Sequence, residues 1–203
     1  TVLLISNLSC SVMSLVDVTL PFSDVSISAW YYDEVKNVFE SGIMEGKTST
    51  KFDPTANMSR AEFVTVLARL SGDDFEGKGA SLTFSDTKSN AWYADYVTWG
   101  VETEMVKGLP GNKFAPDQAV SRQEMAVMAW NVLKAMGISE RGRLVFSDGG
   151  EIADWAKEAV EILGGCDVIH GRTGKDGLNF EPKEPVTRAE AAVILSNMAK
   201  LLP

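Results

Sequence analysis

The sequence has few of the residues and patterns on which most catalytic and metal sites depend. Its two cysteines, Cys10 and Cys166, are too few for a disulfide framework and lie in no CxxC or Cys/His metal spacing. The single histidine, His170, has no second imidazole with which to share a metal, so we interpret it as a polar loop residue. There is no GxSxG nucleophile elbow and no phosphate-binding glycine loop. The sequence therefore predicts no metal site and no cofactor.

Positive charge is also scarce. The chain has 28 acidic and 19 basic residues in 203, which gives a net charge of −9 and a pI near 4.7. A sequence-independent nucleic-acid binder needs a basic footprint, so nucleic acid is excluded as a partner. No polybasic run is present that could tether the chain to a membrane surface.

Residues 1–21 form an apolar N-terminal segment with no formal charge in its first 16 positions. It resembles the apolar part of a secretory signal peptide that lacks the basic start. The alternative, an amphipathic extension that packs on the body of the protein, stays open. Length and polar interruptions argue against a membrane span. Residues 7–9 make a poor lipoprotein cleavage site before Cys10, so we expect no lipidation there.

What the sequence does contain is one unit in three copies. Phe-Ser-Asp recurs every 62 residues, at 22–24, 84–86 and 146–148. In each copy a Trp, a Gly, a Phe-x-Pro motif and a Ser/Thr-Arg-x-Glu motif follow in the same order. The third copy has one extra residue before its Trp and a longer loop between Gly171 and Phe180. The predicted repeats are 22–83, 84–145 and 146–203.

Each repeat is predicted to be a helix, a loop and a second helix. The first helix begins near the Trp and carries apolar residues on one face. Phe-x-Pro closes the loop, and a capping box then starts a second, more apolar helix. Segments 71–83 and 137–145 are predicted linkers. Two helices alone bury little surface, so we expect the second helices to share one core in an all-α, pseudo-threefold domain around a central helical bundle.

The Ser/Thr-Arg-x-Glu motif is only partly explained by helix capping. The hydroxyl and the Glu form the capping box, but the Arg stands at the first helical position, where a cation faces the positive end of the helix dipole. Three residues occupy this unfavourable position: Arg60, Arg122 and Arg188. Helix capping does not explain why an Arg recurs at this position.

The order of these motifs over residues 22–202 resembles the S-layer homology family. The resemblance implies a three-pronged all-α spindle with grooves between copies, in a secreted protein at the bacterial cell surface. Members hold a surface protein on the cell wall by binding a secondary wall polysaccharide, often one with pyruvate ketals on N-acetylmannosamine. The partner would thus be an anionic, pyruvylated polymer, and the chain would belong to a larger surface protein. The motif arginines Arg60, Arg122 and Arg188 would bind the ligand.

The chemistry of arginine is consistent with that role. A guanidinium binds a ketal carboxylate through two parallel charge-assisted hydrogen bonds, and free amides at a helix N-terminus would add donors. Repulsion from the acidic protein is screened beyond about 8 Å. The other interpretation is an ion pair between each Arg and an acidic residue of a neighbouring copy. Because surface ion pairs contribute little, we expect Arg60→Ala or Arg188→Ala to weaken wall binding while changing the unfolding free energy by less than about 1 kcal/mol.

Three further sets of residues are candidates for ligand binding, each with a structural alternative. The tryptophans suit the face of a sugar ring but equally suit a core anchor at a helix start. The aspartates could accept hydrogen bonds from sugar hydroxyls or serve in turns and caps. The glycines are predicted loop residues with permissive φ that also let a ligand approach the backbone. The sets are Trp30, Trp92 and Trp155; Asp24, Asp86 and Asp148; and Gly46, Gly108 and Gly171.

The copies are not equal in sequence. Copy two has Gln123 where the others have Ala, and it has Glu104 where copy one has Gly42. A negative charge near a groove would weaken a site for an anion, so we expect any site that uses copy two to differ. On this basis Arg122 is the least secure of the three arginine assignments.

The function favoured by these observations is a non-catalytic wall anchor. A glycosidase would need a unique pair of carboxylates, whereas the acidic residues of this chain recur with the repeat. A second alternative is a helical-repeat scaffold that binds protein partners on an extended surface, which would place no demand on an Arg at the helix start.

Overall fold

The computed structural model describes residues 20–202 with the exception of 176. The apolar segment 1–21 therefore lies almost wholly outside the described residues, and both predictions made for it stay untested. In the described part the fold is all-α, as predicted, apart from one short hairpin. The helices are α1 (Tyr32–Glu40), α2 (Arg60–Ser71), α3 (Ala94–Glu102), α4 (Arg122–Ala135), α5 (Asp154–Gly165) and α6 (Arg188–Ala199), with short 3₁₀ turns at Lys78–Ser81 and Gly149–Glu151.

The longer loop of the third copy forms the hairpin. Strands β1 (Arg172–Gly174) and β2 (Gly177–Asn179) pair antiparallel, with Thr173 opposite Leu178. The other two copies have isolated bridges in the same loop, between Thr48 and Lys51 and between Leu109 and Lys113. The hairpin is thus an extension of a turn common to all three copies.

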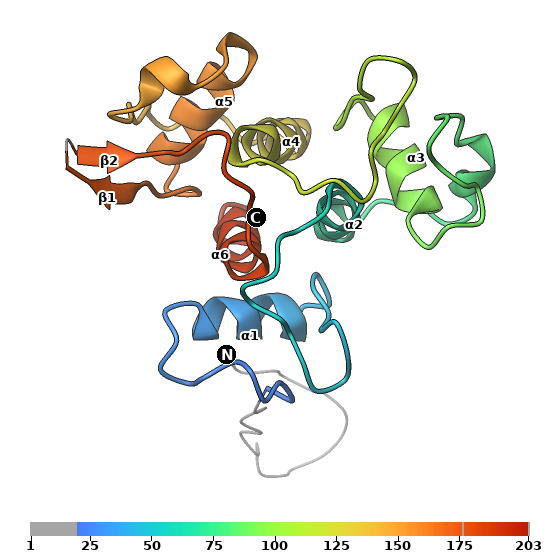
Figure 1. The fold of residues 1–203 in the computed structure, drawn as a ribbon, viewed down its shortest axis with the longest axis horizontal. Helices are drawn as coiled ribbons and strands as arrows, with labels where there is room; N and C mark the ends of the chain where they lie inside the picture. Colours follow the sequence, from blue (N-terminus) through green and yellow to red (C-terminus); the bar gives the residue numbers. More distant parts are fainter. Residues whose placement is uncertain (1–19, 176, 203) are drawn as a thin grey trace, which may run out of the picture.

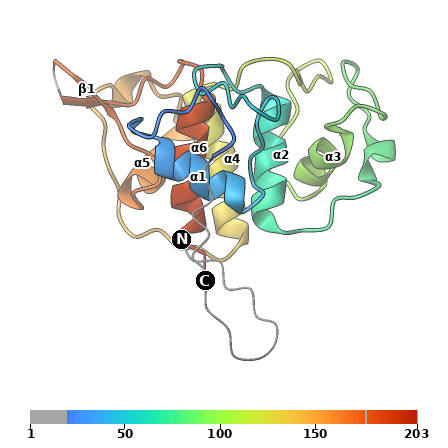
Figure 2. The ribbon, with the colours of Figure 1, turned by 90° about the horizontal axis from the view of Figure 1, so that it is seen from below.

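Helices α2, α4 and α6 lie together in the middle of the molecule, where Figure 1 shows them nearly end-on, and Figure 2 shows them side by side. All three start from a capping box in which the hydroxyl accepts from the N3 amide and the Glu accepts from the N-cap amide. The predicted caps of the second helices are therefore confirmed.

Each first helix packs on the second helix of another copy. The main contacts between helices join α3 to α2, α5 to α4 and α1 to α6. Figure 1 shows α1, α3 and α5 around the three central helices, each beside the helix on which it packs. Because α1 of the first copy covers α6 of the last, the three copies close on themselves.

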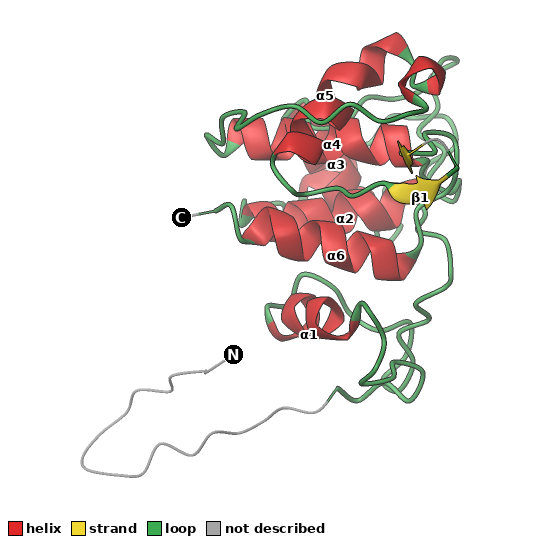
Figure 3. Ribbon diagram, turned by 90° about the vertical axis from the view of Figure 1, so that its left-hand side faces the viewer, coloured by secondary structure: helices red, strands yellow, loops and turns green. Residues whose placement is uncertain are grey.

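A ring of backbone hydrogen bonds fixes this closure just before the central helices. Met58 N donates to Val186 O at 2.8 Å, Val120 N to Met58 O at 2.9 Å, and Val186 N to Val120 O at 3.0 Å. The three residues stand two positions before the three motif arginines, and all are fully buried. The N-termini of α2, α4 and α6 therefore meet at one end, where Figure 3 shows the loops and the hairpin gathered.

One hydrophobic core serves all three copies. Buried apolar residues from every helix form a single continuous cluster. The Phe of each Phe-x-Pro motif is fully buried in it, and its ring lies 5.4–5.6 Å from the Phe ring of the Phe-Ser-Asp motif in the same copy. The loop motifs are consequently parts of the core as well as connections between helices.

Candidate functional site

The motif arginines are buried at the boundaries between copies. Exposed fractions are 2% for Arg60, 4% for Arg122 and 5% for Arg188. Each side chain reaches into the following copy, and that of the third copy reaches into the first. The expectation of surface ion pairs is therefore wrong, because these guanidinium groups are enclosed by the loops of the neighbouring copy.

Two contacts are the same at all three boundaries. Nε donates to the carbonyl of the Phe in Phe-x-Pro, and Nη2 donates to the carbonyl of the residue before the motif glycine. The Nε contacts are Arg60 to Phe114 O at 3.0 Å, Arg122 to Phe180 O at 2.6 Å and Arg188 to Phe52 O at 2.7 Å. The Nη2 contacts are to Lys107 O at 3.2 Å, His170 O at 3.1 Å and Glu45 O at 2.7 Å in the same order.

The third contact involves the capping-box Glu of the following copy. Arg60 Nη1 donates to Glu124 Oε1 at 2.9 Å, and Arg122 Nη1 donates to Glu190 Oε1 at 3.1 Å. The interpretation as an ion pair with a neighbouring copy is thus confirmed for these two arginines. Arg188 differs, because its Nη1 contact is to Met58 Sδ at 3.9 Å.

Each guanidinium also lies over an aromatic ring. The distances from Cζ to the centroid of the Phe-x-Pro phenyl ring are 4.7–5.2 Å, which is the range of cation–π contacts. Burial lowers the pKa of Arg60, Arg122 and Arg188, and nearby carboxylates oppose the change. Arginine remains charged in proteins, so three buried cations hold the copies together.

At the start of α2, α4 and α6 the backbone amides of the first turn already donate hydrogen bonds within the protein. Arg60 N donates to Gln118 O at 2.9 Å, Ala61 N donates to Pro116 O at 3.1 Å, and the N3 amide donates to the capping hydroxyl. The same pattern recurs at α4 and α6. The sequence-based argument that these amides would bind an anion is therefore wrong, because carbonyls of the following copy already accept from them.

The motif aspartates bind the backbone of their own copy. Asp86 accepts from Phe114 N at 2.8 Å and Ala115 N at 2.9 Å, one amide on each carboxylate oxygen. Asp24 and Asp148 do the same with the equivalent residues. The second amide belongs each time to a residue with φ between 56° and 60°. The aspartates thus stabilise the left-handed turn of Phe-x-Pro, and a direct contact with a ligand stays a prediction.

The motif glycines are required for a different reason from the predicted one. Gly46, Gly108 and Gly171 are not among the described glycines with positive φ. A Cβ at Gly46 would lie 2.4 Å from Phe22 Cε1, and one at Gly108 would lie 2.3 Å from Phe84 Cε1. The prediction of permissive φ is therefore wrong. These positions need glycine because the Phe ring of Phe-Ser-Asp packs directly on the backbone.

The motif tryptophans lie on the surface. Exposed fractions are 67% for Trp30, 61% for Trp92 and 59% for Trp155. The first two make edge contacts with the adjacent Tyr31 and Tyr93, at centroid distances of 5.2 and 5.4 Å. The interpretation as core anchors is wrong, while the interpretation as sugar-stacking residues stays a prediction.

The two distinctive residues of copy two lie at different boundaries between copies. The side chain of Gln123 accepts from Ala153 N at 3.1 Å and so has a structural role. Glu104 takes φ 61° at the end of α3, in the loop that leads to Lys107 O on Arg60. Arg122 contacts copy three. Glu104 therefore bears on the Arg60 boundary, and Gln123 bears on the Arg122 boundary.

Two cations that the sequence analysis did not single out lie beside these boundaries. Lys47 and Arg172 directly follow the motif glycines of copies one and three, where copy two has Leu109. Lys47 Nζ forms an ion pair with Glu62, and Arg172 Nη2 donates to Glu190 Oε1 at 2.6 Å. Comparison of the three copies position by position, starting from the glycine, would have found them.

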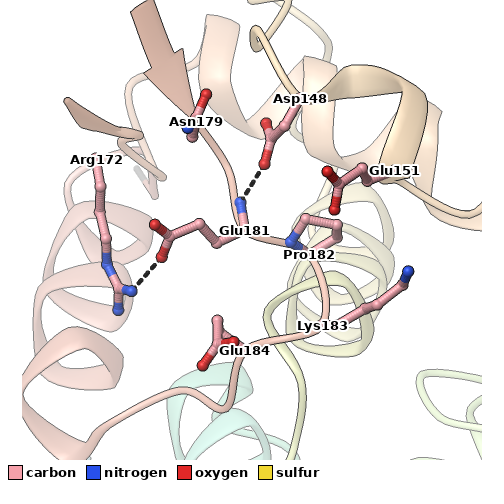
Figure 4. A pocket seen from close by; sticks show the side chains of 8 residues that line it. All are labelled: Asp148, Glu151, Arg172, Asn179, Glu181, Pro182, Lys183 and Glu184. Carbon is pink, nitrogen blue, oxygen red and sulfur yellow. Dashed lines mark hydrogen bonds and ion pairs between the residues drawn. The ribbon is translucent and has the colours of Figure 1, made fainter. Parts of the chain in front are cut away.

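Arg172 also lines a pocket of about 520 Å³ in the third copy (Figure 4). Its Nη1 donates a hydrogen bond to the Glu181 carboxylate, and the backbone amide of Glu181 donates to Asp148. The lining is Asp148, Glu151, Arg172, Asn179, Glu181, Pro182, Lys183 and Glu184. Four carboxylates face two cations, so this pocket is unfavourable for an anionic ligand.

Two carboxylates at the boundaries, Glu62 and Glu190, have lowered pKa values. Burial would raise the pKa of Glu190, but hydrogen bonds from Thr187 and Arg172 and the charge of Arg122 lower it below its ordinary value of 4.5. The pKa of Glu62 is lowered in the same way, with Lys47 as the main cation. Their stabilising effect is complete above the ordinary value and is lost as the pH falls through the lowered value.

We therefore expect the free energy of unfolding to fall as the pH is lowered from about 6 to about 3. Urea denaturation at a series of pH values measures the slope. Glu190→Gln should flatten it, whereas Thr187→Ser, which keeps the capping hydroxyl, should leave it unchanged. An equal slope in the wild type and in Glu190→Gln would contradict this assignment.

The described residues were compared with the requirements of a membrane-spanning helix and of a metal site. None of the helices there is long and apolar enough to cross a membrane. The same residues contain no group of three or more His, Cys, Asp or Glu that could hold a metal ion.

Comparison with known proteins identifies the family. The S-layer homology domain matches the chain three times, at residues 21–64, 83–126 and 145–192. These matches cover more than half of the chain, and each includes the Phe-Ser-Asp and Ser/Thr-Arg-x-Glu motifs of one copy. The chain belongs to the S-layer homology family. Its modules anchor surface proteins to the bacterial cell wall, which agrees with the expected location at the cell surface.

Relatives include both structural proteins and enzymes. The chain is 29% identical to the surface-layer 125 kDa protein of Lysinibacillus sphaericus over 84% of its length. It is 29% identical over 88% of its length to an endoglucanase of Bacillus sp. (strain KSM-635), and 30% identical over 75% to a cellulosome-anchoring protein of Acetivibrio thermocellus. It spans 14%, 18% and 34% of these relatives, so the match concerns one part of each.

Proposed function

We propose that this chain anchors a larger surface protein to the cell wall by binding an anionic secondary wall polysaccharide, one that carries pyruvate ketals on N-acetylmannosamine. The observation that carries the proposal is the exposure of Trp30, Trp92 and Trp155, whose rings the core does not use. Exposed aromatic rings at equivalent positions of three copies are suited to stacking on the apolar faces of sugars.

The motif arginines supply the charge that a pyruvylated polymer needs. Arg60, Arg122 and Arg188 lie at the three boundaries between copies, and each guanidinium has more N–H groups than its three protein contacts use. The motif aspartates and glycines contribute by shaping the loops that surround them. The type of parent protein does not follow from this binding function, since relatives that match this chain include an endoglucanase and an S-layer protein.

Sedimentation with purified cell walls tests the proposal. The protein should pellet with intact walls and lose most of this binding to walls from which the secondary polysaccharide has been removed chemically. A variant with Trp30→Ala, Trp92→Ala and Trp155→Ala should bind intact walls at least about tenfold more weakly, because it loses three stacking rings. Ile27→Ala, which removes another exposed apolar side chain of the first copy, is the matched control.

Equal binding to intact and stripped walls would overturn the polysaccharide assignment. Absence of binding to either would favour a scaffold for protein partners. That alternative has less support from the fold, because the three copies close on themselves and do not form an extended stack.

A further inference from the structure

The three arginine boundaries differ in what faces Nη1. At the Arg60 and Arg122 boundaries this nitrogen donates to a carboxylate of the following copy, at 2.9 and 3.1 Å. At the Arg188 boundary its contact in the described part of the chain is to Met58 Sδ at 3.9 Å. A thioether is a weak acceptor, so a cation that is 95% buried lacks the anionic partner that its two equivalents have.

The cause lies in Lys47. The carboxylate equivalent to Glu124 and Glu190 is Glu62, whose Oε2 accepts from Ser59 N at 2.9 Å and whose Oε1 forms an ion pair with Lys47 Nζ. Copy two has Leu109 in place of Lys47, and there the free oxygen of Glu124 turns to the arginine. Lys47 therefore takes the Glu62 oxygen whose equivalents at the other two boundaries accept from the arginine.

The Arg122 boundary also has a second cation, but there the motif arginine has a carboxylate partner. Arg172 bonds both Glu181 and Glu190, and Glu190 Oε1 still accepts from Arg122. Four carboxylates line the adjoining pocket, in which Figure 4 shows Glu181 and Glu184 on the side of Arg172. Both arginines there are already paired with protein carboxylates.

The other carboxylates described near Arg188 do not pair with its guanidinium. Asp24 and Asp53 are the carboxylates besides Glu62 whose charge acts on it. Both oxygens of Asp24 accept from backbone amides, and Lys51 lies near it. Among these described groups no carboxylate has a hydrogen bond to the guanidinium of Arg188.

We propose that the Arg188 boundary is the principal binding site for the carboxylate of the anionic wall polymer, and that Lys47 makes it so. Lys47 keeps Glu62 off Arg188, and its ammonium group, on a side chain 40% exposed, is the second cation for the same ligand. The Arg60 boundary is the weakest site, because Glu124 already pairs with its arginine and Leu109 stands where the other two boundaries have a second cation. This inference rests on the proposed function and specifies which of the three boundaries performs it.

The test uses the whole chain labelled with ¹⁵N and a single sugar as probe, the methyl glycoside of N-acetylmannosamine carrying a pyruvate ketal. The Nε–Hε signals of Arg60, Arg122 and Arg188, assigned by replacing each arginine with lysine, are followed by NMR during titration. The Arg188 signal should shift at the lowest concentration of probe. Lys47→Leu should weaken this binding about tenfold, the loss expected for one charge-assisted hydrogen bond.

The reverse substitution is the matched control. Leu109→Lys should draw Glu124 away from Arg60, so that the Arg60 signal shifts at lower probe concentration than in the wild type. Equal shifts at all three arginines, a first response at Arg60, or unchanged affinity in Lys47→Leu would each overturn the inference. The proposed function fails separately, if the same proteins bind stripped walls as well as intact ones.

Discussion

Arg60→Ala is expected to destabilise the protein by about 3–5 kcal/mol. The substitution removes a cation that is 2% exposed and leaves Glu124 Oε1, Phe114 O and Lys107 O without their donor. A buried group that loses its partner retains its desolvation cost, and three groups are affected here. Since small proteins have total stabilities of about 5–15 kcal/mol, the variant should unfold at a much lower urea concentration.

Two other variants test whether the loss of stability comes from the buried hydrogen bonds of Arg60. Arg60→Lys keeps the charge but lacks the planar fork that reaches three acceptors, so it should lie between alanine and the wild type. Arg143→Ala removes an arginine whose three acidic partners are at the surface, and its denaturation curve should coincide with that of the wild type. If Arg60→Ala also coincided with the wild type, the buried contacts would not contribute to stability.

Leu67→Ala is expected to cost about 2–5 kcal/mol. Leu67 is fully buried on α2, in the core that all three copies share. Its removal leaves a cavity that fixed neighbours on several helices cannot fill. Because the core is continuous, the unfolding transition should shift as a whole and stay single, which thermal denaturation followed by circular dichroism measures.

The matched comparison is Ile27→Ala. Ile27 is 81% exposed, so the loss of its side chain should change the unfolding free energy by less than about 0.5 kcal/mol. Two separate transitions in Leu67→Ala would show that the copies unfold independently, against the shared core. A change as small as that of Ile27→Ala would mean that the site collapses around the cavity.

The local features of the fold could be predicted from the sequence. Ser59 and Glu62 and their equivalents form capping boxes, which depend on residues three positions apart, and the structure confirms them. The 62-residue period and the motif order also identify the repeats without any knowledge of their packing. These signals are strong because they depend on short-range chemistry that the order of residues expresses directly.

The pairing of the copies could not be predicted in this way. The apolar stripe on α1 is equally compatible with packing on α2 or on α6, because a hydrophobic face does not specify its partner. The carbonyls that bind Arg60 are backbone atoms present at every position, so no sequence pattern marks Phe114 O or Lys107 O. The same holds for Gly108, whose need for glycine arises from the ring of Phe84, 24 residues earlier in the chain.

The contact of α1 with α6 also limits how this architecture can grow. An open stack can gain a copy at either end, since its last unit always presents a face to the next. Here each central helix already has a partner, and the three backbone bonds among Met58, Val120 and Val186 are all made. A fourth copy would find no vacant position. Further copies added to this architecture would therefore have to form complete sets of three of their own.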